Sequence, residues 1–331
     1  MLRCIKNQGV TGIFLNSLRA MYASLMSCVR VNNQITDYID CPVGVRQGCV
    51  LSPTLFSMFV NQITEEMTQK GKQGFQYLPG LTELFILLFA DDIALISLTP
   101  RGLQNQLNVL NDCCKRIKLN VNTQKTKVMV FRKGGYLGAR EVFYFDGTKL
   151  DIVNKYCYLG YNFTTQISHK IGTEHLVVKG KKALNDLVRA LKNNQEINYK
   201  VFFKIFDAKI QPILLYSAEI WGMNRIDNIE KVHVLACKKF LRVPICTPNK
   251  MVYGELGRYP LYVSSYTMCL KYWFKLLTMG EDRLPKAAYK MQMIMDERGK
   301  KCWVSQIREI LCLTGFNIVW LQQGVGNARS F

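Results

Sequence analysis

The clearest hydrophobic pattern in this 331-residue chain lies between Leu84 and Ser97, in the sequence LFILLFADDIALIS. An apolar run leads into Asp91 and Asp92, and a second apolar run follows at once. Two short runs rich in β-branched and aromatic residues predict two buried strands rather than one helix. The segment is also too short and too charged to cross a bilayer. It therefore predicts a β-hairpin that reverses at residues 90–92, with two carboxylates at its tip.

Helical periodicity flanks this hairpin on both sides. Apolar residues spaced by three and four predict an amphipathic helix over 12–26, and a second helix is expected over 102–119. Between them, Ser52 followed by Pro53 predicts a helix start with serine as the N-cap. Turn dipeptides also predict two short hairpins, which reverse at Asn32–Asn33 and Asp146–Gly147.

After about residue 165 the strand patterns give way to helical ones. Helices are expected over 176–191, 199–215 and 232–241, so we place a domain boundary near residue 165. The last seventy residues contain no motif that indicates a function. There, Trp273, Trp303 and Trp320 are expected to pack a helical core.

The charge of the chain indicates a polyanionic partner. The hydrophobic content of 49% is enough for real cores, and the formal net charge is +20. Residues 1–100 carry seven basic and seven acidic residues, whereas residues 101–135 carry eight basic residues against Asp112 alone. Positive charge thus begins just after the acidic hairpin, which favours a nucleic acid as the partner.

The cysteines and the N-terminus bear on the cellular location. None of the twelve cysteines forms a C-x-x-C pair, and the three histidines complete no zinc spacing. We therefore expect reduced thiols in an intracellular protein of the nucleus or cytoplasm. The N-terminus lacks the apolar core of a signal peptide, and no segment reaches transmembrane length, so no membrane partner is expected.

Three sites could carry chemistry, and each has a plainer alternative. Asp91 and Asp92 would repel each other unless a cation such as Mg²⁺ joined them, but Asp-Asp is also a common solvated turn dipeptide. The residues Arg46-Gln47-Gly48 ahead of the 52–53 helix start could let a nucleotide or template base approach the backbone, or form a solvated loop. Lys125 could lie near the hairpin or at a solvated strand entrance. On these residues alone the alternatives stay open.

The order of the motifs resembles the palm of reverse transcriptases, specifically those of LINE-like, non-LTR retrotransposons. The motifs of the resemblance are RQGC at 46–49 together with LSP at 51–53 and LF at 55–56, then FADD at 89–92, then the strand entrance 122–131, and then YLG at 158–160. PILLYSAEIWG at 212–222 and YGELGRYPL at 253–261 resemble the region that follows the polymerase core in the same elements. The similarity covers most of the chain, and four ordered motifs are far more specific than one.

The resemblance implies a role for each matching residue. Asp91 would be the principal Mg²⁺ ligand, with Asp92 supporting it, and Lys125 would assist the departure of pyrophosphate. The loop Arg46, Gln47 and Gly48 would contact the RNA template and the incoming deoxynucleotide. The last matching motif would hold the DNA primer end; it consists of Tyr158, Leu159 and Gly160.

The resemblance also implies an α+β fold. We expect a partial right-hand polymerase palm over residues 1–165, with an antiparallel sheet and helices, then a helical thumb over 166–250 and a C-terminal helical extension over 251–331. The leading hypothesis is an RNA-directed DNA polymerase fragment. The alternative is a nonenzymatic nucleic-acid-binding remnant of such an element, and a weaker third hypothesis is an intron-encoded maturase.

We predict that this chain alone does not polymerise. In the family, a further metal-binding aspartate lies on a strand before the helix placed here at 12–26, and the resemblance implies that this strand is missing. Two-metal nucleotidyl transfer needs carboxylates from both places. A primer extension assay with Mg²⁺ on the purified protein measures this, and robust templated synthesis would refute the prediction.

Overall fold

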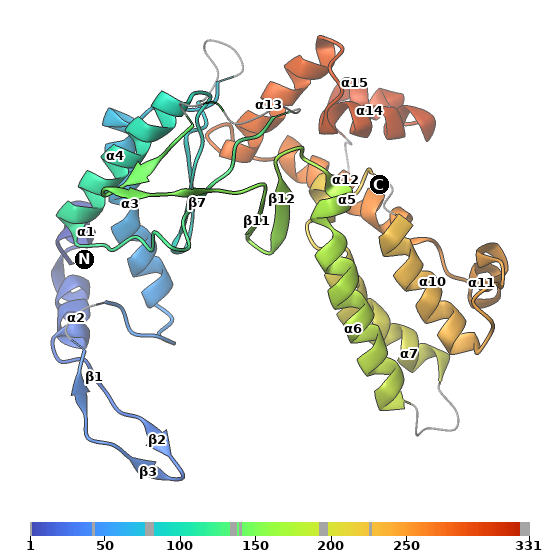
Figure 1. The fold of residues 1–331 in the computed structure, drawn as a ribbon, viewed down its shortest axis with the longest axis horizontal. Coiled ribbons are helices and arrows are strands. Elements are labelled where there is room, and N and C mark those ends of the chain that lie inside the picture. The colour runs from blue at the N-terminus through green and yellow to red at the C-terminus, as the bar shows by residue number, and fades with distance from the viewer. Residues whose placement is uncertain are drawn as a thin grey trace. The chain divides into compact units, whose positions relative to one another are not determined.

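Figure 1 shows the computed structural model of this chain, which describes residues 2–41, 44–76, 83–132, 138, 141–191, 198–224 and 227–324. The described residues divide into two compact units. Unit 1 takes in residues 2–76, 83–126 and 138–151, and unit 2 takes in residues 127–132 and 152–324. Helices and small antiparallel sheets occur together, which confirms the α+β class in this coarse form.

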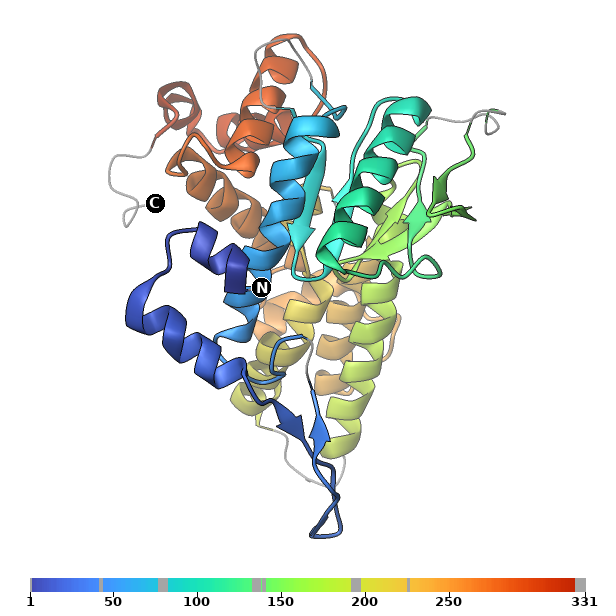
Figure 2. The ribbon, with the colours of Figure 1, turned by 90° about the vertical axis from the view of Figure 1, so that its left-hand side faces the viewer.

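Figure 2 draws the helices of unit 1 in blue to green. The helix predicted over 12–26 ends at Tyr22; Leu15 and Leu18 are buried on it, whereas Ile13 and Met21 are exposed. Helix α3 buries the predicted face, including Ile63 and Met67, and Glu66 on α3 pairs with Arg116 on α4. A small core of Ile5, Leu15, Leu18 and Leu55 joins the first three helices. The bounds of the helices are α1 (Leu2–Asn7), α2 (Gly12–Tyr22), α3 (Ser52–Lys70) and α4 (Pro100–Ile117).

The predicted start of α3 is wrong by one residue. Leu51 is the N-cap, Ser52 is the first helical residue, and no side chain caps the helix. The Ser52 hydroxyl instead donates to the Arg46 carbonyl at 2.6 Å and lies 3.2 Å from the Tyr22 hydroxyl. The serine therefore fastens the preceding loop to the helix, and this tertiary bond replaces the local cap.

The short hairpins of unit 1 reverse where the sequence predicted. Asn32 and Asn33 both have positive φ, as do Asp146 and Gly147, which matches the two-residue type I′ turn. The residues of strands β1 to β4 and of the turn between β2 and β3 are all exposed. The strands are β1 (Met26–Ser27), β2 (Arg30–Val31), β3 (Gln34–Ile35), β4 (Ile39–Asp40), β8 (Tyr144–Phe145) and β9 (Thr148–Lys149).

The central hairpin consists of β5 (Ile86–Phe89) and β6 (Asp92–Leu95), paired antiparallel. The prediction that its strands are buried is only partly correct, because Ile86 is buried but Phe89 is 61% exposed. These two strands form a two-stranded sheet, so neighbouring strands cover little of it. The buried Gln106 of α4 donates to the Ile96 carbonyl at 3.1 Å and fixes the base of the hairpin.

Unit 2 is built around one large apolar core of helices. Phe202, Phe206 and Leu214 are fully buried in it, and Gly180 lets α6 approach α8 so closely that a Cβ would lie 2.4 Å from Leu214 Cδ2. The predicted helix 199–215 contains a π-helical turn, η1. The bounds are α5 (His169–Gly172), α6 (Glu174–Leu191), α7 (Tyr199–Ile205), η1 (Phe206–Ile210), α8 (Gln211–Leu214), α9 (Ala218–Trp221), α10 (Asp227–Leu241) and α11 (Asn249–Leu256).

The strands near the start of unit 2 include one that the sequence did not predict. Within residues 155–161, β11 (Lys155–Tyr158) is followed by a turn, and β12 (Tyr161–Thr164) pairs back on β11. Before them lie β7 (Lys127–Val128) and, at the junction of the two units, β10 (Asp151–Ile152). The Val153 N–H donates to the Val128 carbonyl at 2.9 Å.

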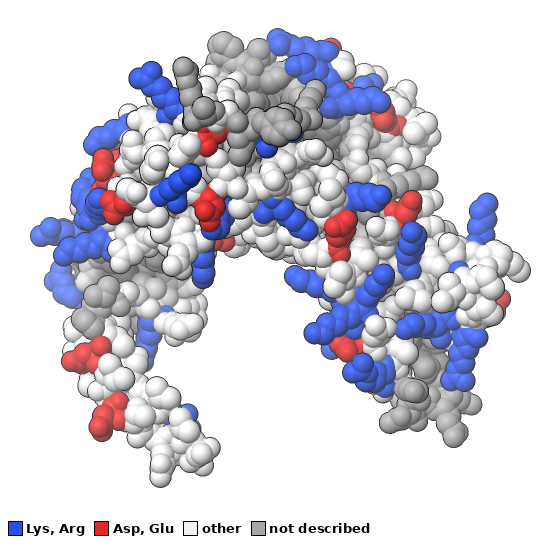
Figure 3. All heavy atoms as spheres, in the orientation of Figure 1, with Lys and Arg blue, Asp and Glu red and all other residues white. Residues whose placement is uncertain are grey.

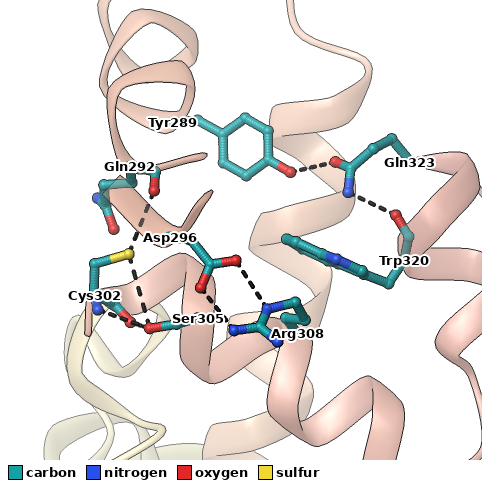
Figure 4. Close-up of polar contacts among 8 residues, drawn as sticks. All are labelled: Tyr289, Gln292, Asp296, Cys302, Ser305, Arg308, Trp320 and Gln323. Carbon is teal, nitrogen blue, oxygen red and sulfur yellow. Dashed lines mark hydrogen bonds and ion pairs between the residues drawn. The ribbon is translucent and has the colours of Figure 1, made fainter. Parts of the chain in front are cut away.

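The C-terminal helices have a second core around the predicted tryptophans. Trp273 is fully buried and Trp320 nearly so, their rings stack, and Trp303 packs against the same core. Arg308 on α14 forms a two-pronged ion pair with Asp296 on α13, at 2.8 and 2.9 Å (Figure 4). The helices are α12 (Leu261–Leu277), α13 (Leu284–Glu297), α14 (Trp303–Leu313) and α15 (Asn317–Gln322).

Two findings bear on the predictions about the membrane and the cysteines. No helix within the described ranges is both long and apolar enough to cross a membrane. All twelve cysteines are free thiols.

A polar network fastens α10 to the segments that follow it. Glu230 accepts hydrogen bonds from His233 Nδ1, the Tyr253 hydroxyl and the Leu261 N–H. Arg258 Nε–H donates to His233 Nε2 at 3.0 Å, so His233 must carry its proton on Nδ1. Arg258 also forms a two-pronged ion pair with Asp207. Burial alone would raise the pKa of Glu230, but its three hydrogen bonds outweigh burial and hold the pKa below the ordinary value.

We predict that Glu230→Gln lowers the free energy of unfolding by about 1–3 kcal/mol at pH 7, because an amide cannot accept all three hydrogen bonds. A carboxylate with a lowered pKa stabilises the fold above its ordinary pKa of 4.5 and loses that contribution as the pH falls through the folded-state value. The difference between wild type and variant should therefore be constant from pH 7 to about pH 5 and shrink below it. Urea denaturation at several pH values measures this.

Glu255→Gln is the matched control for this prediction. Glu255 lies on α11 in the same unit and is exposed, so its substitution should change stability by less than about 0.5 kcal/mol. Equal effects of the two substitutions, or a difference that does not vary with pH, would contradict the proposed role of Glu230.

Candidate active site

Asp91 and Asp92 lie at the tip of the β5–β6 hairpin. Phe89 pairs with Asp92, so the chain reverses through the two residues Ala90 and Asp91, and Ala90 has φ of 52°. This confirms the predicted reversal, with Asp92 as the first residue of the returning strand. Both aspartates are exposed. The tip therefore presents two adjacent carboxylates to solvent on a rigid two-residue turn.

The carboxylate pair fits part of a metal site. Among the residues that the structure describes, no group of three or more His, Cys, Asp or Glu side chains could hold a metal ion. Mg²⁺ is commonly held by one or two protein carboxylates, with substrate phosphates and water completing the octahedral shell. Asp91 and Asp92 supply the right donor atoms for such an arrangement, and the substrate would have to supply most of the rest.

The loop ahead of α3 is a tight turn that the Ser52 hydroxyl fastens to the start of the helix. The Cys49 N–H donates to the Arg46 carbonyl at 3.3 Å, and Gly48 has φ of +84°, a backbone conformation that favours glycine. No heavy atom of the described residues lies within 4 Å of a Cβ built on Gly48, so those residues leave its backbone open to approach. Arg46, Gln47 and Gly48 are all exposed. A ligand could thus reach the backbone of this loop beside the exposed guanidinium group of Arg46.

The Cys49 thiol reports the electrostatics of this loop. Hydrogen bonds from the backbone, above all from the Leu51 N–H, lower the pKa of Cys49 despite some desolvation. These N–H groups belong to the start of the 19-residue helix α3, where unpaired donors and the helix dipole favour negative charge. The same field would favour a phosphate in the loop.

Lys125 lies in a turn at the end of unit 1. Its N–H donates to Asn122 Oδ1 at 3.1 Å, and the Thr126 hydroxyl donates to the Asn122 carbonyl at 2.9 Å. Asn122 thus shapes the turn, and Lys125 is exposed on it. The turn leads into β7, as the sequence predicted for a strand entrance.

Tyr158, Leu159 and Gly160 form the end of β11 and the turn into β12, in unit 2. Tyr158 pairs with Tyr161, and Leu159 and Gly160 have φ of 47° and 79°. The Tyr216 hydroxyl donates to the Leu159 carbonyl at 2.6 Å, and His175 Nε2 lies 2.8 Å from the Gly160 carbonyl. Sequence reasoning did not identify Tyr216 or His175 as part of the site. The sequence indicated Tyr216 only through its position within the motif PILLYSAEIWG.

The structure places most of the predicted residues in unit 1 and the YLG turn in unit 2. In unit 1, no hydrogen bond or ion pair among described residues connects Asp91 or Asp92 to Arg46 or Gln47. The candidate residues are therefore exposed groups on separate turns, and a substrate would have to bridge them. This arrangement suits a large charged ligand better than a small molecule.

Basic side chains are abundant on the surface of unit 2. On the face drawn in Figure 3, Lys and Arg gather over the region where Figure 1 draws α6 and α7. Helix α6 exposes Lys179, Lys181 and Lys182, and its exposed Asn185 accepts a hydrogen bond from Lys239 of α10 at 3.0 Å. This patch, defined by these four lysines, is a suitable surface for a phosphate backbone.

Comparison with known proteins bears directly on these residues. The family model described as reverse transcriptase (RNA-dependent DNA polymerase) matches residues 4–163. Over 224 residues, 66% of its length, the chain is 25% identical to "Probable RNA-directed DNA polymerase from transposon BS" of Drosophila melanogaster. It is 23% identical over 212 residues, 60% of its length, to "RNA-directed DNA polymerase from mobile element jockey" of the same species. A transposon-derived protein of Caenorhabditis elegans is 30% identical over 149 residues, 42% of the chain.

The matches cover only part of each relative. They span 24% of the transposon BS protein, 22% of the jockey protein and 49% of the Caenorhabditis protein, so the chain covers about a quarter of the two Drosophila relatives. The matched family region contains every residue singled out from the motifs, from Arg46 to Gly160. Over residues 4–163 the chain is therefore similar to the reverse transcriptase family, and the two Drosophila relatives are named as RNA-directed DNA polymerases of mobile elements.

Proposed function

We propose that this chain is the rear palm and thumb of an RNA-directed DNA polymerase, the part that contacts an RNA template, a DNA primer and a deoxynucleotide but does not polymerise alone. The observation that carries the proposal is the two-residue Ala90–Asp91 turn, which presents Asp91 and Asp92 together within the matched family region. In this assignment unit 1 contributes the nucleotide side of the site, and the helices that follow β12 form the thumb.

Each residue has a role that its surroundings support. Asp91 and Asp92 would hold Mg²⁺, which when bound neutralises phosphate charge and activates the attacking primer hydroxyl. Arg46 meets the nucleotide phosphates, and the open backbone at Gly48 lets Gln47 and the loop approach the base pair. Lys125 donates a proton or a hydrogen bond to the leaving pyrophosphate. Tyr158, Leu159 and Gly160 hold the primer end.

The basic patch on α6 supports a role for unit 2 in holding the nucleic acid. Lys179, Lys181 and Lys182 are exposed on α6, and Lys239 of α10 meets the same helix at Asn185, so exposed positive charge from two helices adjoins one surface. Such contacts position a duplex without reading its sequence, as a polymerase that copies any template requires.

A second candidate is a nonenzymatic nucleic-acid-binding remnant. Two observations favour it. The described residues contain no cluster of three or more metal-binding side chains, and the chain has a formal net charge of +20. In that case the basic surface binds nucleic acid while the carboxylates have no catalytic use. Salt-dependent binding without metal binding at the hairpin tip would distinguish it from the polymerase assignment.

We predict that Asp91→Asn with Asp92→Asn weakens Mn²⁺ binding at least about tenfold in the presence of primer–template and deoxynucleotide, because these carboxylates are the protein ligands of the metal. Electron paramagnetic resonance of free Mn²⁺ measures the binding. The control is Asp37→Asn with Asp40→Asn, which removes the same charge from exposed positions in unit 1. Equal losses in both double variants would point to general electrostatics and against the site.

We further predict that Lys179→Ala, Lys181→Ala and Lys182→Ala together reduce the slope of log affinity against log salt by about two to three, since each lost phosphate contact removes about 0.9. Filter binding of an RNA–DNA hybrid at several salt concentrations gives the slope. Lys271→Ala, Lys275→Ala and Lys301→Ala remove the same charge from exposed positions of the C-terminal helical region. The assignment of the patch fails if this control lowers the slope as much.

A further inference from the structure

The β11–β12 turn is an exposed turn with a demanding backbone. Leu159 and Gly160 both have positive φ, which glycine adopts freely but leucine rarely does. Leu159 is 36% exposed, and Gly160 is exposed as well. A turn of this kind at the surface would ordinarily have its two carbonyls hydrated and its orientation set only by the strands.

Instead, two side chains from distant parts of the chain contact the two turn carbonyls. Tyr216, 57 residues away, donates its hydroxyl to Leu159 O at 2.6 Å. His175, 15 residues away on α6, lies 2.8 Å from Gly160 O through Nε2. Because a carbonyl oxygen only accepts, Nε2 must carry the hydrogen for this bond to form. Each carbonyl of the turn is thus held by its own side chain.

Both side chains are anchored in the body of unit 2. The Tyr216 carbonyl accepts a hydrogen bond from the indole of buried Trp221 at 3.0 Å. His175 is the second residue of α6, and its Nδ1 lies 2.9 Å from the carbonyl of Gly172, the last residue of α5. Because an imidazole with its single hydrogen on Nε2 has none on Nδ1, the anchor of His175 is the backbone of its helix, and that of Tyr216 is the hydrogen bond from Trp221.

Close packing at two glycines adds to the contacts that Tyr216 and His175 make with the turn. A Cβ on Gly160 would lie 3.3 Å from Tyr216 Cε1, so the turn rests against the tyrosine ring. A Cβ on Gly172 would lie 2.5 Å from the Tyr161 hydroxyl, so the end of α5, just before α6, packs directly on β12. The ring of Tyr161 packs against the core, where burial raises its pKa to about 12. The turn, α6 and the segment before α9 form one rigid assembly.

We propose that Tyr216 and His175 are positioning residues, which fix the Leu159–Gly160 turn relative to α6 so that the turn holds the primer 3′ end in one place. This inference rests on the proposed primer-holding role of residues 158–160. Water could satisfy both exposed carbonyls, so the two hydrogen bonds add little to folding, and their main effect is on the orientation of the turn.

The test uses the full chain and two ligands of equal length: an RNA template annealed to a DNA primer with a recessed 3′ end, and the matching blunt hybrid. Fluorescence anisotropy gives the ratio of the two affinities for each protein. We expect Tyr216→Phe to lower the preference for the recessed end about threefold to tenfold and to leave blunt-hybrid affinity unchanged. His175→Leu should act in the same direction, and His175→Gln, which keeps a donor, should restore most of the preference.

Tyr199→Phe is the matched control. The Tyr199 hydroxyl also donates to a carbonyl 57 residues away, that of Leu256, at 2.8 Å, and its exposure of 40% is close to the 44% of Tyr216. It should leave the preference unchanged. Urea midpoints of all variants, and amide exchange at Gly160 and Tyr161, separate a reoriented turn from an unfolded protein. Exchange should rise in Tyr216→Phe and in His175→Leu but not in Tyr199→Phe.

The outcomes separate this inference from the proposed function. If the wild type prefers the recessed end and Tyr158→Ala abolishes the preference, but Tyr216→Phe behaves like Tyr199→Phe, the positioning role is wrong and the primer-holding role stands. If the wild type binds both ligands equally, the primer-holding role fails and the positioning role fails with it.

Discussion

The pairing of Phe89 with Asp92 is the constraint on which the candidate site depends. It leaves only Ala90 and Asp91 to reverse the chain, so Asp91 lies in the turn and Asp92 begins the returning strand directly after it. Both aspartates are exposed, where water screens the repulsion between their charges. A slip of one residue in the register would move the turn along the chain and send alternate side chains to the other face of the hairpin. The position of the two carboxylates thus depends on the register of four residue pairs.

The turn at Leu159–Gly160 is held in a different way. The tip of β5–β6 needs only its own strands, whereas the tip of β11–β12 is held by Tyr216 and His175 from outside the hairpin. A local turn can vary in orientation with its short sheet, but a turn bonded to a helical core cannot. The two turns illustrate two physical solutions to presenting an exposed group: local backbone pairing in one unit and tertiary hydrogen bonding in the other.

The two later motifs are mainly structural in this chain. In YGELGRYPL, Tyr253 and Leu261 bind Glu230, and Arg258 binds Asp207 and His233. In PILLYSAEIWG, the apolar residues fill the core of unit 2, and the Glu219 carbonyl accepts a hydrogen bond from Trp303 at 3.0 Å. These contacts connect the helices after β12 to the C-terminal helices. Their physical role is to make unit 2 one packed body.

Local patterns in the chain predicted most of the helices, the hairpin turns at Asn32–Asn33, Asp146–Gly147 and the acidic pair, and the resemblance to reverse transcriptases. These features were predictable because the spacing of apolar residues and the chemistry of turns act over a few residues. Tertiary structure decided the rest. Ser52 leaves the N-cap to bind Arg46, β12 forms against β11 without a strand pattern of its own, and Tyr216 meets Leu159. These outcomes depend on groups distant in sequence, whose meeting is set by packing and not by any local pattern.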